Sequence, residues 1–156
     1  MKLYEFEGHG LLAKAGIDSP FFIVCKNLAE VKAARSKFKF PLVAKVQVLS
    51  GKRSKGGGVV VISREAQLAE FASAHFGKEF NDEEVRFIEL SQKVDFENEY
   101  YVSINYDTVS RMPYVMFCPK GGVEIEENIA AGEEILRADI DPLSGPEKAQ
   151  FKKWPV

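Results

Sequence analysis

Cysteine is scarce in this sequence. The 156 residues include two cysteines, Cys25 and Cys118, and these are not spaced as a CxxC pair. Both lie in apolar stretches, where a reduced thiol behaves as a small hydrophobic side chain. The sequence therefore predicts two buried, reduced thiols in preference to a disulfide.

Long apolar runs and a strong charge of one sign are also missing. No apolar run approaches the ~18 residues that a membrane span needs. The net charge of -2 argues against an electrostatic nucleic-acid binder. Residues 1–7 are acidic and lack the apolar region of a signal peptide. We therefore predict a soluble cytoplasmic protein, or one of the mitochondrial matrix if a transit peptide has been removed, with neither nucleic acid nor membrane as a partner.

The composition is that of an ordinary globular protein, with 46% hydrophobic and 28% charged residues. The length suits one domain or two small lobes. Segments with helical spacing are interleaved with segments of strand character, which predicts an α+β (α/β) fold. Helices are expected at 9–15, after Asn27 with Glu30 as its capping-box partner, and after Ser63 as N-cap. Strands are expected at 21–26, 42–49, 59–62, 85–90, 99–107 and 113–118, a polar loop at 81–84, and an extended or loosely held tail from Asp139.

The strand at 42–49 carries polar residues on one of its faces. Alternation places Leu42, Ala44, Val46 and Val48 on one side, and puts Lys45 and Gln47 together on the other. A lysine inside an apolar strand must find a partner or water. An edge-strand lysine that reaches solvent is the alternative, and it explains Lys45 but not its combination with Gln47 and the loop that follows.

That loop, residues 50–58, is rich in glycine and in positive charge. Its sequence S-G-K-R-S-K-G-G-G contains four glycines together with Lys52, Arg53 and Lys55. Glycines let backbone N–H groups approach a ligand closely, and three cations suit a polyphosphate. The loop does not fit the Walker A pattern. A solvated basic hairpin tip remains the alternative from this segment alone.

Two glutamates and two histidines complete the set of candidate residues. Glu89 ends an apolar strand and Glu99 opens the next, so either carboxylate could accept hydrogen bonds from ribose hydroxyls, although each alone is more often a surface group. His9 and His75 have no visible triad or metal partner and are interpreted as helix-surface residues. The acidic residues Glu124, Glu126 and Glu127 are candidates to attract Mg²⁺, but no spacing shows that they converge with the loop.

The order of several short segments resembles the β-subunit family of succinyl-CoA synthetases, which extends to citryl-CoA synthetase and ATP-citrate lyase chains. Each segment is weak alone, but the ordered set is specific and covers about residues 1–145. The segments are Leu3–Glu7 with Leu11–Leu12 and Ala15–Ile17, Val43–Val48, Gly51–Val59, Glu99–Tyr101, Gly121–Glu126 and Asp141–Gly145.

The resemblance implies an ATP-grasp fold, in which two α+β lobes hold a nucleotide between them. Residues 1–145 would form a partial domain, with the smaller lobe at about 20–90 and the start of the second lobe after it; 146–156 would be a tail of unknown role. Lys45 would contact the phosphates, residues 88–90 the base, and Glu99 the ribose. The implied nucleotide-binding residues are Lys45, Gln47, Gly51, Lys52, Arg53, Ser54, Lys55, Ile88, Glu89, Leu90 and Glu99, with no catalytic or metal-ligating residue in this chain.

The implied activity is that of an NDP-forming acid–CoA ligase. The complete enzyme uses ATP or GTP with Mg²⁺ to phosphorylate a histidine on an α-type CoA-binding partner, and CoA enters only in that complete enzyme. The metal ligands and the CoA-binding domain belong to regions this chain lacks, so the isolated chain is expected to make no acyl-CoA. A shortened, non-catalytic nucleotide-binding module and a subunit-interaction module remain as alternatives.

The loop departs from the family pattern G-G-R-G-K-A-G-G at three positions. Lys52 and Ser54 replace glycines, and Gly56 replaces an alanine. Lys52 lies where side-chain size can affect base choice or loop closure, which leaves ATP and GTP both open. The acid substrate is also open, because no residue of this chain contacts it in the family pattern.

Overall fold

The computed structural model describes residues 2–122, 125, 130, 132, 134–152 and 154. The fold mixes helices and sheets, as the sequence predicted. The chain divides into two compact units, Met1–Asp95 and Phe96–Val156. The predicted acidic cluster of Glu124, Glu126 and Glu127 lies outside the described residues. The predicted lobe boundaries stay a prediction. Within the part of the chain that the structure describes, no helix has the length and apolar character needed to cross a membrane.

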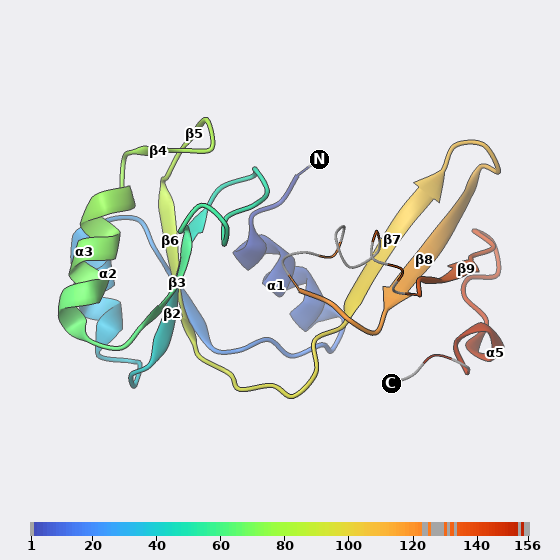
Figure 1. Cartoon of the computed structure of the whole chain (residues 1–156), viewed down its shortest axis with the longest axis horizontal. Helices are drawn as coiled ribbons and strands as arrows, with labels where there is room; N and C mark the ends of the chain where they lie inside the picture. Colours follow the sequence, from blue (N-terminus) through green and yellow to red (C-terminus); the bar gives the residue numbers. More distant parts are fainter. Residues whose placement is uncertain are drawn as a thin grey trace. The chain divides into compact units, whose positions relative to one another are not determined.

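The first unit is built on a four-stranded sheet in the order β1-β6-β2-β3, with every neighbouring pair antiparallel. Helices α2 and α3 cover one face of this sheet, and α1 lies against the opposite face (Figure 1). The predicted hairpin that flanks the glycine-rich loop is confirmed as the β2–β3 pair. The elements are α1 (Glu5–Lys14), β1 (Phe22–Cys25), α2 (Leu28–Arg35), β2 (Leu42–Gln47), β3 (Val59–Ile62), α3 (Glu65–His75), β4 (Glu79–Phe80), β5 (Glu83–Glu84) and β6 (Phe87–Gln92).

The core lies between the sheet and the pair α2 and α3. Strand β2 turns Leu42, Ala44 and Val46 toward it, and all three are fully buried. Strand β6 contributes Ile88 and Leu90 to the same core. The predicted alternation of β2 is therefore confirmed, and it leaves the opposite face of the strand to polar residues under α1.

The helix starts show one confirmed prediction and two corrections. Asn27 caps α2 by accepting a hydrogen bond from the Glu30 N–H at 2.9 Å. Helix α1 begins at Glu5 rather than at position 9, because the Glu7 carboxylate accepts from the Tyr4 N–H at 2.9 Å and satisfies a donor at the helix start. The N-cap of α3 is Arg64, and not Ser63 as predicted.

The segment predicted as a polar loop at 81–84 is instead part of a small hairpin. Strands β4 and β5 pair across Asn81 and Asp82, whose φ angles are 50° and 63°. Two consecutive residues with positive φ are what a tight hairpin turn requires, and Asn and Asp tolerate this conformation better than most residues. The hairpin matters for the site because Asn81 Nδ2 donates to the Gly51 carbonyl oxygen at 2.9 Å.

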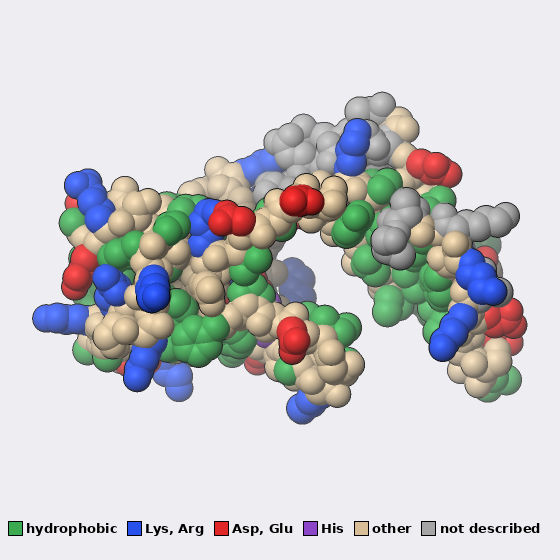
Figure 2. All heavy atoms as spheres, turned by 90° about the horizontal axis from the view of Figure 1, so that it is seen from below, with side chains coloured by type: hydrophobic (Ala, Val, Ile, Leu, Met, Phe, Trp, Pro, Cys, Tyr) green, Lys and Arg blue, Asp and Glu red, His purple; other side chains and the backbone are tan. Residues whose placement is uncertain are grey.

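The second unit contains a three-stranded antiparallel sheet in the order β7-β8-β9. The predicted extended or loose tail from Asp139 is only partly correct, because a short helix forms there and the Trp154 ring stacks on Phe117 with centroids 5.3 Å apart. Hydrophobic side chains are visible on the surface of this unit in Figure 2. The elements are β7 (Tyr101–Asp107), β8 (Met112–Cys118), β9 (Leu136–Asp139) and α5 (Lys148–Phe151).

Candidate functional site

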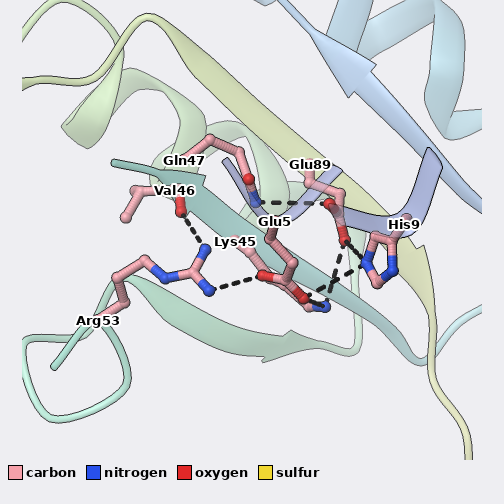
Figure 3. Close-up of polar contacts among 7 residues, drawn as sticks. All are labelled: Glu5, His9, Lys45, Val46, Gln47, Arg53 and Glu89. Carbon is pink, nitrogen blue, oxygen red and sulfur yellow. Dashed lines mark hydrogen bonds and ion pairs between the residues drawn. The ribbon is translucent and has the colours of Figure 1, made fainter. Parts of the chain in front are cut away.

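A polar cluster fills the space between α1 and the sheet of the first unit (Figure 3). Strands β2 and β6 contribute Lys45, Gln47 and Glu89, and register makes Lys45 and Glu89 direct partners. Helix α1 contributes Glu5 and His9, and Arg53 enters from the glycine-rich loop. The predicted association of Lys45 with Gln47 and this loop is thus seen in the structure.

Lys45 is held between two carboxylates. Its Nζ donates to Glu5 Oε1 at 2.6 Å and lies 3.2 Å from Glu89 Oε1. Strand β2 is central in the sheet, with β6 on one side and β3 on the other. The edge-strand interpretation of this lysine is therefore wrong, and its charge is satisfied by acidic groups.

Arg53 shares the Glu5 carboxylate with Lys45. Its Nη2 donates to Glu5 Oε2 at 2.7 Å, while its Nη1 donates to the Val46 carbonyl oxygen at 3.1 Å. One oxygen of Glu5 thus pairs with the strand lysine and the other with the loop arginine (Figure 3). The strand and the loop present two cations to a single anion.

Glu89 is the most deeply buried charged group of the cluster, with a fully buried side chain. Gln47, itself 1% exposed, donates from Nε2 to Glu89 Oε2 at 3.5 Å. Burial raises the pKa of Glu89; Lys45 and His9 oppose this, Glu5 adds to it, and the pKa stays above its ordinary value.

Glu5 experiences the opposite balance. Burial alone would raise the pKa of its carboxyl, but the hydrogen bond from Lys45 and the charges of Lys45 and Arg53 together hold the pKa below its ordinary value. The two carboxylates of the cluster therefore differ. Glu5 is firmly ionised, whereas Glu89 binds its proton more tightly than an exposed glutamate does.

Sequence reasoning missed Glu5 and placed His9 wrongly at the helix surface. The His9 side chain is 15% exposed, and its Nε2 lies 3.6 Å from Glu5 Oε1 and 3.8 Å from Glu89 Oε1. A helix start at residue 5 would have been the signal, because positions 5 and 9 then share one face of α1. A predicted helix that starts at residue 9 leaves Glu5 outside the helix, so the face that the two residues share is not recognised.

The loop turns some of its predicted residues inward and leaves others outward. Arg53 points into the cluster, whereas Lys52, Ser54 and Lys55 are exposed. Gly51 accepts from Asn81, and the Ser54 carbonyl oxygen accepts from the Gly57 N–H at 3.2 Å. Lys52, which replaces a family glycine, has a φ of 63°, a conformation that glycine adopts at no steric cost.

Two glycines of the loop are required by close packing. A Cβ on Gly58 would lie 2.5 Å from Val46 Cγ2 and 2.7 Å from Phe80 Cζ, and a Cβ on Gly56 would lie 2.8 Å from Phe80 Cζ. The Phe80 ring therefore packs closely against the loop at both Gly56 and Gly58. This contact accounts for glycine at position 56, where the family pattern has alanine.

Within the first unit, two of the predicted residues lie outside the cluster. Ile88 and Leu90 point into the core on the opposite face of the sheet. Glu99 belongs to the second unit, where its carbonyl oxygen accepts from the Gly121 N–H at 2.7 Å. Contacts of these residues with a base or a ribose stay predictions.

Comparison with known proteins decides the family. The sequence profile of the ATP-grasp domain family matches residues 2–154. The chain belongs to the ATP-grasp family. This confirms the fold family implied by the ordered segments of the sequence.

The curated relatives of this ATP-grasp chain are β subunits of ADP-forming succinate–CoA ligase. The protein from Staphylothermus marinus is 34% identical over 146 residues, which cover 93% of this chain and 38% of the relative. The protein from Methanocaldococcus jannaschii is 36% identical over 160 residues, covering 100% of this chain and 42% of the relative. The chain thus spans about two fifths of the length of these relatives.

Two solved structures share the fold. Ca. Korarchaeum cryptofilum ACD1, solved in complex with coenzyme A, matches with a TM-score of 0.69 and 21% identity over 88% of this chain and 59% of its own. ATP citrate lyase from Methanothrix soehngenii, in complex with citrate and coenzyme A, matches with a TM-score of 0.67 and 18% identity over 92% of this chain and 36% of its own. At these identities the similarity extends to the fold of the ATP-grasp chain.

One group of side chains in the described part of the chain has the composition of a metal site. Glu5, His9 and Glu89 each offer a ligand atom, and these atoms lie within 4.8 Å of one another. The Lys45 ammonium already lies 2.6 Å and 3.2 Å from the two carboxylates, so a metal ion would meet a like charge. Mg²⁺ also prefers an all-oxygen shell. The Glu5, His9 and Glu89 group therefore does not fit Mg²⁺. Its Glu5 carboxylate instead pairs with the cations of Lys45 and Arg53.

Proposed function

We propose that this ATP-grasp chain binds ATP or GTP through its phosphates, as the nucleotide-binding part of an NDP-forming acid–CoA ligase. The observation that carries the proposal is the convergence of Lys45 and Arg53 on one carboxylate, at 2.6 Å and 2.7 Å. The central strand β2 supplies Lys45 and the glycine-rich loop supplies Arg53. The two cations are placed so that each contacts a different oxygen of the same anion. A phosphate group presents such oxygens.

The chemistry assigned to these residues is charge neutralisation and positioning. Phosphoryl transfer depends mostly on holding the phosphates in place and on stabilising the charge that develops on their oxygens. Glu89 on the neighbouring strand β6 holds Lys45 in place, and the Val46 carbonyl oxygen holds Arg53 in place. Both cations are therefore preorganised, which lowers the reorganisation needed when a ligand arrives.

The rest of the ligase activity is assigned to other polypeptide regions. The relatives are β subunits, and this chain spans 38% and 42% of the two compared above. We assign the acceptor histidine and CoA binding to an α-type CoA-binding partner, and the Mg²⁺ ligands to the remainder of the ATP-grasp subunit. The mixed Glu5, His9 and Glu89 group supports this division, because Lys45 already pairs with both of its carboxylates.

Calorimetric titration with ATP and GTP tests the proposal. We expect saturable binding at roughly millimolar affinity, because half of a nucleotide cleft leaves contacts unmade. Lys45→Gln removes one of the two cations and should weaken binding about tenfold or more, equivalent to about 1.4 kcal/mol. Lys78→Gln removes an exposed lysine outside the cluster and serves as the matched control.

Two outcomes would overturn the proposal. One is the absence of saturable binding of either nucleotide by the wild-type chain. The other is binding by the Lys45→Gln variant that equals that of the wild type, provided that circular dichroism shows both variants to be folded. Binding of nucleotide without ligase activity, when the α-type partner and the remaining ATP-grasp region are supplied, would favour the non-catalytic module.

A further inference from the structure

The anion position between Lys45 and Arg53 is filled by a side chain of the protein itself. Each oxygen of the Glu5 carboxylate meets one of the two cations, at 2.6 Å and 2.7 Å (Figure 3). A carboxylate and a phosphate are both oxyanions, and both accept hydrogen bonds from lysine and arginine with similar geometry. The Glu5 carboxylate and a phosphate cannot both occupy this position, because they would overlap and both carry negative charge.

The position of Glu5 on α1 allows its side chain to leave without moving the helix. Helix α1 is docked on the sheet by other contacts: the rings of Tyr4 and Phe6 meet Phe87 with centroids 5.4 Å and 5.6 Å apart, and His9 meets Phe22 at 4.8 Å. The Glu5 side chain keeps 24% exposure, so it has access to solvent. A rotation of this side chain would therefore open the position while the aromatic contacts remain.

Lys45 keeps a partner when Glu5 leaves. Glu89 Oε1 lies 3.2 Å from Lys45 Nζ and comes from β6, a different element from α1. Arg53 likewise keeps its hydrogen bond to the Val46 carbonyl oxygen. Both cations therefore stay in place on the sheet side, and release of Glu5 exposes a preformed position for an anion.

We propose that Glu5 is an internal competitor of the nucleotide phosphate and that its side chain thereby gates the phosphate site. The inference rests on the proposed function and adds a regulatory residue to the same site. A ligand phosphate binds only in exchange for Glu5, so the measured affinity is reduced by the fraction of molecules in which Glu5 is seated. A purely structural Glu5, which holds Lys45 and Arg53 in position for the ligand, gives the opposite result, because its removal would weaken binding.

Binding of inorganic tripolyphosphate, ATP and GTP to a set of variants distinguishes these two roles. Glu5→Gln removes the charge of the competitor and should tighten binding of all three ligands by about fivefold or more, equivalent to about 1 kcal/mol. Glu5→Asp keeps the charge but shortens the side chain, so that it reaches both cations less well, and should tighten binding to a smaller extent. Glu70→Gln removes a negative charge from the exposed face of α3 and should change affinity by less than about twofold.

The outcomes separate this inference from the proposed function. Equal or weaker binding by both Glu5 variants, with wild-type binding intact, would overturn the gate and leave the nucleotide site standing. Absence of binding by every protein in the set, up to several times the expected millimolar range, would overturn the nucleotide site and the gate together. Should Glu5→Gln fail to fold, Glu5→Asp decides, because it retains the ion pairs in weakened form. Tightening by the control Glu70→Gln to the same extent would also contradict the gate, since it would assign the effect to overall charge.

Discussion

Lys45 and Glu89 are direct register partners on β2 and β6, and Lys45 Nζ lies 3.2 Å from Glu89 Oε1. The pair lies on the face of the sheet that α1 covers, where Glu89 is fully buried. Removing one partner of a buried pair usually destabilises a protein, because the other charge is left uncompensated. Here Glu5 also pairs with Lys45, so the lysine would keep a carboxylate partner if Glu89 lost its charge.

Glu89→Gln should raise the free energy of unfolding at pH 8 relative to the wild type. The pKa of Glu89 is raised in the folded state, chiefly by burial, so the folded chain binds this proton more tightly than the unfolded chain. The stabilisation from a protonated Glu89 is present at low pH and is lost as the pH rises through the folded-state pKa. The variant is neutral at every pH and does not incur this loss.

Urea unfolding of both proteins at pH 5 and at pH 8 measures the effect. The advantage of Glu89→Gln should be larger at pH 8 and should shrink at pH 5, where the wild-type carboxyl is closer to protonation. An advantage that stays constant with pH, or a variant less stable than the wild type at pH 8, would contradict the prediction. Glu70→Gln again provides the control for a change in overall charge.

The strand and the loop of the site could be predicted from sequence because their signals are local. Strict alternation along 42–49 placed Lys45 on the face opposite the core, and glycine and lysine content marked the loop at 50–58. Both patterns depend on side-chain direction along a single segment. The structure therefore confirms the face of β2 on which Lys45 lies and the position of the loop between β2 and β3.

The acidic half of the cluster could not be predicted in the same way. Glu5 lies 40 residues before Lys45 in the sequence, and only the packing of α1 on the sheet brings the two together. Glu89 was interpreted as a group for ribose because strand position alone cannot say which element covers a face. The contacts of Arg53 and the Phe80 ring with the loop are equally non-local, because they join the loop to other elements of the fold.

Gly58→Ala should destabilise the first unit by about 1 to 3 kcal/mol, the usual cost of forcing an extra methyl group into a packed site. The added Cβ would lie 2.5 Å from Val46 Cγ2 and 2.7 Å from Phe80 Cζ. Gly51→Ala is a matched control from the same loop, because a Cβ there meets nothing within 4 Å and should change stability by less than about 0.5 kcal/mol. Denaturant unfolding of the two variants makes the comparison. Equal stabilities would show that the loop moves away from Phe80 at little cost.

The Cys25 thiol should be unreactive in the folded chain. Burial and the neighbouring Glu30 raise the pKa of Cys25 to about 11, and the side chain is fully buried. Thiolate is the reactive species, so the rate of disulfide exchange with an aromatic reagent at pH 8 should fall on the order of 100-fold below that of an ordinary cysteine. The measurement uses a Cys118→Ala background, with labelling in denaturant as the reference. Rapid stoichiometric labelling without denaturant would contradict the prediction.

Ile104 and Val115 are register partners on β7 and β8 and share one face of the second sheet, but they differ in exposure, at 73% and 9%. Among the described residues β7 is an edge strand, and Val102 and Tyr106 on the same face are also exposed, at 61% and 60%. An apolar face on an edge strand favours association with other chains.

Ile104→Lys should therefore lower self-association in sedimentation velocity at high protein concentration. It should change unfolding stability by less than about 0.5 kcal/mol. Val115→Ala should instead destabilise the second unit by about 1 to 2 kcal/mol, because it removes methyl groups from a packed site. If Ile104→Lys destabilises the chain as much as Val115→Ala does, the Ile104 side chain is packed in solution, and the exposed face of β7 is covered by the protein itself.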